Sequence, residues 1–369
     1  MKIDRIEQFY VQMPLKSFFE TSFGREDVVE KVVLAVYADG LVGYGESPVE
    51  KNPFYSAETA DTSWLIQRDY LIPMLLGTDI GHASEIPARL GRVRGHNMAK
   101  AGLEAAIWDL ESQIAGVSIA RLLGGTRQKI NSGVSIGIQN SIEDLLGQIE
   151  TYLGEGYQRI KIKIKPGWDQ SVVERVRARF SDVLLMVDAN SAYTLADAPM
   201  LTALDGFDLL MIEQPLAYDD ILDHAELQKQ VKTRICLDES IHTVGRAREA
   251  LTLGSCKIIN IKPARVGGMT QARQIHDICQ EHDIPVWCGG LLETGVGRAH
   301  NIAMASLPNF SLPGDISASD RYWHEDIIDP PFALNDDGTI DVPSVPGLGV
   351  AVIRERLARV SAQMADYRA

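Results

Sequence analysis

The sequence is poor in cysteine, in long apolar runs and in basic residues. Only four cysteines occur among 369 residues, all after residue 235 and without a CxxC pair, so we expect buried free thiols. No apolar stretch approaches the roughly 18 residues that cross a bilayer. The first residues carry neither a long apolar segment nor a small-residue cleavage site. These absences predict a soluble, cytoplasmic protein.

The shortage of basic residues argues against nucleic acid as a partner. The chain has 36 lysines and arginines against 50 acidic residues, a net charge of -14, which repels a phosphate backbone. The one dense cationic cluster, residues 159–167, alternates lysine with isoleucine. That alternation indicates a β-strand rather than a solvated basic tail.

The first third of the chain predicts an α+β domain over residues 1–125. Residues 28–48 contain two alternating runs joined at Asp39-Gly40, the commonest short hairpin signal. Residues 97–116 have apolar residues at helical spacing, with Gly116 placed to end the helix.

From about residue 130 the pattern changes to short β-branched runs separated by helical stretches. Eight such runs can be counted, the last of them FSLPGDIS at 310–317. Strands alternating with helices predict parallel βαβ units, and eight of them predict a closed α/β barrel over residues 126–320. We expect residues 321–369, with Pro330-Pro331 and several turn signals, to return over the first domain.

Five polar residues interrupt the strand ends at a regular interval. They are separated by 25, 25, 25 and 24 residues and are Lys163, Asp188, Glu213, Asp238 and Lys262. One residue per βα repeat predicts equivalent positions at the carboxyl ends of successive strands, where barrels of this type place their active sites. We therefore predict one constellation of three carboxylates flanked by two lysines.

Three carboxylates on rigid strands suit a hard cation such as Mg²⁺ or Mn²⁺ better than zinc, which prefers nitrogen and sulfur. Each acid could instead only cap a following helix, but that alternative does not explain three equal intervals. Glu239 follows Asp238 directly, so composition leaves the choice of ligand open. The spacing favours Asp238.

Strand alternation places the side chains of residues 160–165 on two faces. Three isoleucines face one way and three lysines the other: Ile160, Ile162 and Ile164 against Lys161, Lys163 and Lys165. In a barrel the apolar face packs on the helices, so we expect the lysines to point inward. A solvated lysine face on an edge strand is the alternative, and a strand enclosed by seven others has no such edge.

This set of groups suits removal of a proton next to a carboxylate. A general base contributes roughly 10² to 10⁴ in rate, which falls short of the 10⁶ or more that enzymes commonly achieve. A cation that binds the substrate carboxylate stabilises the resulting enolate. The base lysine must be neutral, and burial, a nearby metal ion and the positive Lys161 all lower its pKa.

The same residues resemble the muconate-lactonising subgroup of the enolase superfamily. The segments EQPLAYDD, NIKPARVGG, VWCGGLLETGVGRAHN and LPGDISASDRY are similar to those of o-succinylbenzoate synthases, especially the ones that also racemise N-succinylamino acids. The resemblance covers the whole chain. It implies a (β/α)7β barrel and an amino-terminal capping domain whose loops, at 19–24 and 53–55, close over the substrate.

The resemblance also implies roles for individual residues. Lys163 and Lys262 would be the acid/base pair, Lys161 would tune their pKa, and one Mg²⁺ or Mn²⁺ per site would lie on the three carboxylates. Implied substrate-binding residues are Phe19, Ser22, Phe23, Tyr55, Ser135, Gly289, Gly290, Leu291 and Asp315. Implied supporting residues are Asn190, Glu239, Arg265 and Glu293.

Simpler roles stay open for some of these residues. Asn190 could only form a turn, Glu293 could only start a helix, and Arg265 could be a surface arginine. Leu291 stands where many relatives have methionine, so the resemblance does not determine the shape of the pocket for the acyl group. Asp315-Ile316-Ser317 lacks the DxD element of dipeptide epimerases.

The sequence therefore predicts an enzyme that acts on a small carboxylate, in a homo-oligomer. Dehydration of 2-succinyl-6-hydroxy-2,4-cyclohexadiene-1-carboxylate and racemisation of N-succinylamino acids are both implied. Dipeptide epimerase and muconate cycloisomerase are the rival enzymes, since both would use the same five residues. A non-catalytic scaffold is a further alternative, and it predicts that the lysines are dispensable.

Overall fold

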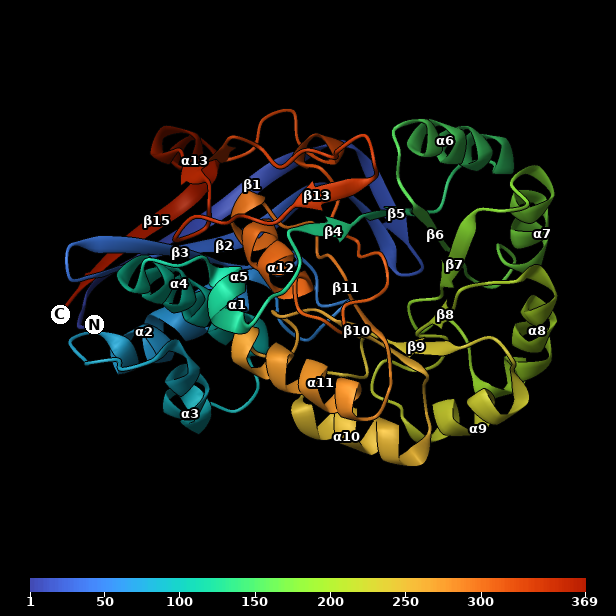
Figure 1. The fold of residues 1–369 in the computed structure, drawn as a ribbon, viewed down its shortest axis with the longest axis horizontal. Helices are drawn as coiled ribbons and strands as arrows, with labels where there is room; N and C mark the ends of the chain where they lie inside the picture. The colour runs from blue at the N-terminus through green and yellow to red at the C-terminus, as the bar shows by residue number, and fades with distance from the viewer.

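The computed structural model describes residues 1–369 as an antiparallel sheet with helices joined to a parallel barrel (Figure 1). The antiparallel sheet has the strand order β15-β1-β2-β3. Its strands are β1 (Ile3–Thr21), β2 (Gly24–Ala38), β3 (Leu41–Ser47) and β15 (Ser361–Arg368). Because β15 pairs with β1, the two chain termini lie side by side (Figure 1).

The predicted hairpin at Asp39-Gly40 is confirmed. It joins β2 to β3, and both turn residues have positive φ, 52° and 79°. The predicted helix is confirmed as α4 (Asn97–Ala115), which ends at Gly116 with φ 67°. The other helices of this part are α1 (Ala60–Ile66), α2 (Ile72–Leu75), α3 (Ile86–Arg89) and α5 (Ile119–Leu123).

Seven parallel strands form the barrel sheet in sequence order. They are β5 (Gly133–Ile136), β6 (Arg159–Lys163), β7 (Leu184–Asp188), β8 (Ile212–Glu213), β9 (Ile235–Leu237), β10 (Ile258–Ile261) and β11 (Val286–Cys288). The helices that follow them are α6 (Ile142–Gly154), α7 (Gln170–Arg179), α8 (Ala198–Ala203), α9 (Leu222–Gln230), α10 (Val244–Leu253), α11 (Met269–Glu281) and α12 (Gly295–Ala305). Helices α6 to α11 form an arc around the strands (Figure 1).

The eighth predicted strand is not a regular strand, although it occupies the eighth position. Phe310 bridges to Val286 on β11, and Gly314 bridges to Ser132 just before β5. Pro313 has no N–H to donate, and this interrupts the ladder. The segment therefore closes the sheet through isolated bridges.

The remaining elements lie in the segment that leads into the barrel and in the carboxyl-terminal segment, residues 321–369. They are β4 (Lys129–Asn131), β12 (Ile328–Asp329), β13 (Thr339–Asp341), β14 (Ala351–Val352) and α13 (Arg354–Val360). None of the helices is both long and apolar enough to span a membrane.

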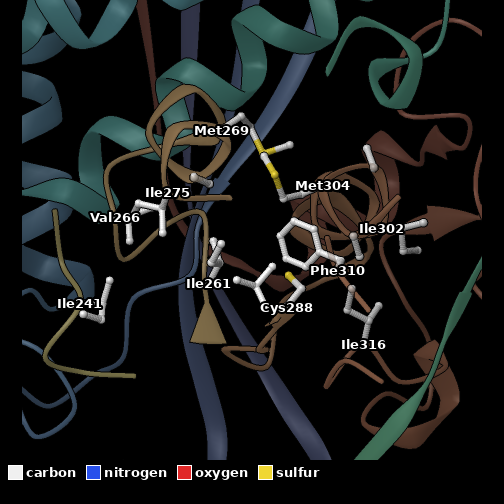
Figure 2. Close-up of a cluster of buried hydrophobic side chains, with 14 of the residues drawn as sticks. Ile241, Ile261, Val266, Met269, Ile275, Cys288, Ile302, Met304, Phe310 and Ile316 are labelled. Atoms are coloured by element: carbon white, nitrogen blue, oxygen red, sulfur yellow. The ribbon is translucent and has the colours of Figure 1, made fainter. Parts of the chain in front are cut away.

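One continuous core of 84 buried residues runs through both parts of the molecule. Figure 2 shows its section under α11 and α12, where Phe310 lies between Cys288 of β11 and Met304 of α12. Ile261 of β10 faces the same cluster. Its neighbour Lys262 therefore points to the opposite side, into the barrel.

Two buried carboxylates of the amino-terminal part bind the starts of barrel helices. Glu104 of α4 accepts from the backbone N–H groups of Met269 (2.5 Å) and Thr270 (3.1 Å) at the start of α11. Glu46 of β3 accepts from the N–H groups of Thr294 (3.1 Å) and Gly297 (2.8 Å) at the start of α12. Because the first N–H groups of a helix have no partner within the helix, these hydrogen bonds satisfy them and fix the first part over the barrel.

Candidate active site

The five regularly spaced residues lie at one end of the barrel. Lys163, Asp188 and Glu213 are the last residues of β6, β7 and β8, and they are level in the strand register. Asp238 and Lys262 each follow directly after the last residue of their strands, β9 and β10. Equal spacing in sequence has thus become adjacency in space.

The two outer lysines come from opposite sides of the barrel. Strand β6 holds the second of the eight positions around it and β10 holds the sixth, so half of the circumference separates them. Lys163 and Lys262 are each only 6% exposed, and both line the same pocket. A small molecule in this pocket has one lysine on either side.

Lys163 is held by a carboxylate and an amide. Its Nζ donates to Oδ2 of Asp188 and to Oδ1 of Asn190, both at 2.7 Å. Asn190 in turn donates to Oε1 of Glu239 at 3.0 Å. Asn190 has a positive φ of 42°, so it both turns the chain and supports the lysine.

Lys161 lies among three carboxylates. Its Nζ is 2.5 Å from Asp315, 2.9 Å from Glu213 and 3.2 Å from Asp188. Burial works to lower the pKa of Lys161, but these three acids outweigh it and raise the pKa above its ordinary value. Lys161 is therefore a fixed positive charge beside Lys163.

Lys262 is held by Asp238 (2.9 Å) and by the hydroxyl of Tyr55 (3.0 Å). Burial works to lower its pKa, but Tyr55, Glu213 and Glu239 outweigh this, and the pKa of Lys262 is raised. Arg265 also pairs with Asp238, and its Nε donates to the carbonyl of Ile241 at 2.7 Å.

The carboxylates of Asp188, Glu213 and Asp238 have the chemistry of a hard-cation site. Each of the three is paired with a lysine or arginine, and no three acidic side chains converge on one point. Oε2 of Glu239 is buried without any hydrogen-bond partner. Burial and the neighbouring Asp188 raise the pKa of Glu213. An unpartnered buried oxygen beside two crowded carboxylates fits an oxygen-binding cation such as Mg²⁺.

Two sequence families match the chain. Residues 144–356 match the family described as enolase C-terminal domain-like, and residues 5–124 match the mandelate racemase/muconate lactonizing enzyme N-terminal domain. The chain belongs to the enolase superfamily. Members of this superfamily combine a lysine or histidine base with one or two Mg²⁺ ions.

Individual members of the superfamily are similar over nearly the whole chain. An o-succinylbenzoate synthase from Geobacillus kaustophilus is 54% identical over 351 residues, 95% of this chain and 93% of that protein. An N-succinylamino acid racemase from Amycolatopsis sp is 50% identical over 362 residues, 98% of each chain. A crystal structure of an enolase-superfamily member from Listeria innocua has a TM-score of 0.96 and 42% identity, covering 100% of this chain and 99% of that one.

The pocket of this enolase-superfamily protein lies between the two parts of the molecule. Most of the predicted substrate-binding residues line it: Phe19, Phe23, Tyr55, Ser135, Gly290 and Leu291. Asn190, Glu293 and Asp315 line it as well. The antiparallel sheet thus supplies one wall and the barrel the other.

Two predicted pocket residues and one predicted side-chain direction differ in the structure. Ser22 is not in the pocket wall, because its Oγ donates to the carbonyl of Asn190 (3.1 Å). Gly289 lies behind the wall, where its N–H donates to Asn260 (2.8 Å). Lys165 does not point inward, because β6 ends at Lys163, and it pairs with Glu20 at the surface (3.7 Å).

Asp315 lines the pocket, and its carboxylate forms ion pairs with two cations. It contacts Lys161 (2.5 Å) and Arg159 (2.7 Å). Burial opposes its ionisation, yet these two cations lower the pKa of Asp315 to about 2. Asp315 therefore holds Lys161 in position, and its predicted contact with the substrate stays a prediction.

Other site residues were missed by the sequence analysis. Asn260 donates to Oε1 of Glu213 at 2.7 Å and also orients Gly289. It is two residues before Lys262, so strand parity could have identified it as inward-facing. Arg298 and Tyr322 also line the pocket, and no spacing signal in the sequence marks them.

Proposed function

We propose that this protein is a divalent-metal-dependent enzyme that removes the α-proton of a succinylated carboxylate. It is both an o-succinylbenzoate synthase and an N-succinylamino acid racemase. The observation that carries the proposal is the opposition of Lys163 and Lys262 across one enclosed pocket. The similarity to relatives with those two activities supports the choice of substrate.

In racemisation, one lysine takes the α-proton from one face while the ammonium of the other returns a proton to the opposite face. Asp188 and Asn190 hold Lys163, and Asp238 and Tyr55 hold Lys262, so each nitrogen has a fixed position. Fixed positions matter because the reacting atoms must be about 3–3.5 Å apart.

In dehydration, a single base is enough. Lys163 removes the proton next to the carboxylate. The C–O bond on the neighbouring ring carbon then breaks, the oxygen takes the proton from the Lys163 ammonium and leaves as water, and the ring becomes aromatic. Lys262 stays positively charged and stabilises the developing negative charge.

Asp188, Glu213 and Asp238 would hold the cation, with Glu239 adjacent. The cation would bind the substrate carboxylate and stabilise the enolate charge. Phe19 and Phe23, at the tip of the hairpin formed by β1 and β2, line the pocket, and their phenyl side chains would exclude water from it.

Dipeptide epimerase is the rival with the same lysines and carboxylates. Asp315-Ile316-Ser317 lacks the DxD element of those enzymes, and Asp315 is engaged by Lys161 and Arg159. The deciding experiment compares kcat/KM for 2-succinyl-6-hydroxy-2,4-cyclohexadiene-1-carboxylate, N-succinyl-phenylalanine and L-Ala-L-Glu. Faster turnover of the dipeptide than of both succinyl substrates would refute the proposal.

A further inference from the structure

One cation in the pocket wall has no acidic partner. Five cationic side chains line the pocket: Arg25, Lys161, Lys163, Lys262 and Arg298. The first four form ion pairs with carboxylates, at 3.0, 2.5, 2.7 and 2.9 Å. Arg298 forms none.

Arg298 lies in the first turn of α12 and is only 3% exposed. Its Nη2 donates to the backbone carbonyl of Glu293 at 3.0 Å, and its Nη1 is buried without any partner. The carboxylate of Glu293 forms no ion pair with Arg298, and it accepts a hydrogen bond from Asn301 at 2.9 Å instead. The ring of Tyr322, 5.7 Å away, offers only a weak cation–π contact.

A buried charge is costly unless a counter-charge and hydrogen bonds compensate it. The other buried cations of this pocket obey that rule, and Arg298 departs from it. The missing partner is therefore expected to be an anionic group of the ligand. Arg25, by contrast, is half-exposed and already paired with Asp27, so it lacks the same need.

Ser135 on β5 supplies a second unsatisfied group in the same pocket. Its side chain is 5% exposed, its Oγ has no hydrogen-bond partner, and it is level in the register with Lys161. A hydroxyl donor and a guanidinium donor that both lack acceptors match the two oxygens of a carboxylate.

We propose that Arg298, assisted by Ser135, binds the distal carboxylate of the substrate's succinyl group. This rests on the proposed function, because both of its substrates carry that group. The lysine pair acts at the α-carbon, and Arg298 selects the acyl chain. One anion subsite then serves both the dehydration and the racemisation, and it disfavours N-acyl groups without a terminal charge.

The test compares N-succinyl-phenylalanine with its neutral isostere, in which the terminal carboxylate is a primary amide. Wild-type enzyme should prefer the carboxylate about 100-fold in kcat/KM, since loss of a buried charged partner is strongly unfavourable. Arg298→Gln should reduce that ratio to about 1. Arg298→Lys should retain part of the ratio, because lysine keeps the positive charge but lacks the paired N–H donors of the guanidinium. Ser135→Ala should reduce the ratio by about threefold to tenfold. Arg248→Gln, on the exposed face of α10, is the matched control and should keep the wild-type ratio.

Equal turnover of the two acyl groups by the wild-type enzyme would overturn the proposal, whether or not the variants fold. The proposal would also be overturned if Arg298→Gln lowered kcat/KM for the succinyl substrate and for its amide isostere by the same factor. The proposed function fails separately: wild-type enzyme that turns over neither N-acylamino acids nor the cyclohexadiene substrate would refute that function, and this subsite with it.

Discussion

Nζ of Lys163 lies 2.7 Å from Oδ2 of Asp188, its neighbour in register on the adjacent parallel strand. The same oxygen is 3.2 Å from Nζ of Lys161. One carboxylate thus contacts both lysines of strand β6, so the base, its neighbouring cation and a proposed metal ligand cannot be altered independently.

We expect activity to require a divalent cation. Chelation should abolish turnover and Mg²⁺ or Mn²⁺ should restore it, because the enolate needs charge stabilisation beyond what a base supplies. Asp188→Asn, Glu213→Gln and Asp238→Asn should each lower kcat/KM about 10³-fold or more. Asp182→Asn, at an exposed position before β7, is the control. Full turnover by a metal-free preparation would refute the prediction.

The tip of the β1–β2 hairpin should act as a lid. Phe19 and Phe23 line the pocket, and Ser22 donates to the carbonyl of Asn190 in the barrel. Deleting residues 17–25 should therefore impair kcat and raise KM while circular dichroism shows a folded barrel. Ser22→Ala removes only one hydrogen bond and should cost about threefold in kcat/KM. If a folded deletion variant kept normal kcat and KM, the hairpin tip would not act as a lid.

Each lysine should serve one face of the substrate. In D₂O, wild-type enzyme should exchange the α-proton of both enantiomers of N-succinyl-phenylalanine, as measured by proton NMR. Lys163→Ala and Lys262→Ala should each lose exchange with a different enantiomer, and neither should racemise. Lys262→Arg keeps the charge but cannot give up its proton, so it should spare dehydration more than racemisation. Equal exchange of both enantiomers by either alanine variant would disprove the two-base assignment.

Glu104 should make stability depend on pH. Burial raises the pKa of this carboxyl to about 7 in the folded protein, although hydrogen bonds from the start of α11 oppose the shift. The folded state then binds more protons than the unfolded state between pH 4.5 and 7, so the stabilisation is present below pH 4.5 and is lost as pH rises through 7. The slope should be at most about 1.4 kcal/mol per pH unit. In Glu104→Gln, the free energy of unfolding should decline less steeply with pH over this range. An unchanged slope would show that Glu104 is not the group responsible.

The sequence by itself determined the parts of the fold that repeat or that depend on local backbone preference. The interval of 24 or 25 residues brought Lys163, Asp188 and Glu213 to level positions, because each βα repeat returns the chain to the same end of the barrel. The turn at Asp39-Gly40 and the end of α4 at Gly116 followed from residues that adopt positive φ at little cost.

The tertiary structure alone decided which partner each of these residues has. Tyr55 reaches Asp238 and Lys262 from the other part of the molecule, and Arg298 lies in the pocket wall without a counter-charge. Neither feature has a sequence signal, because contacts between elements about 200 residues apart depend on how those elements pack. Periodicity fixes the direction of a side chain from its own strand or helix, whereas its neighbours are set by the arrangement of all the others.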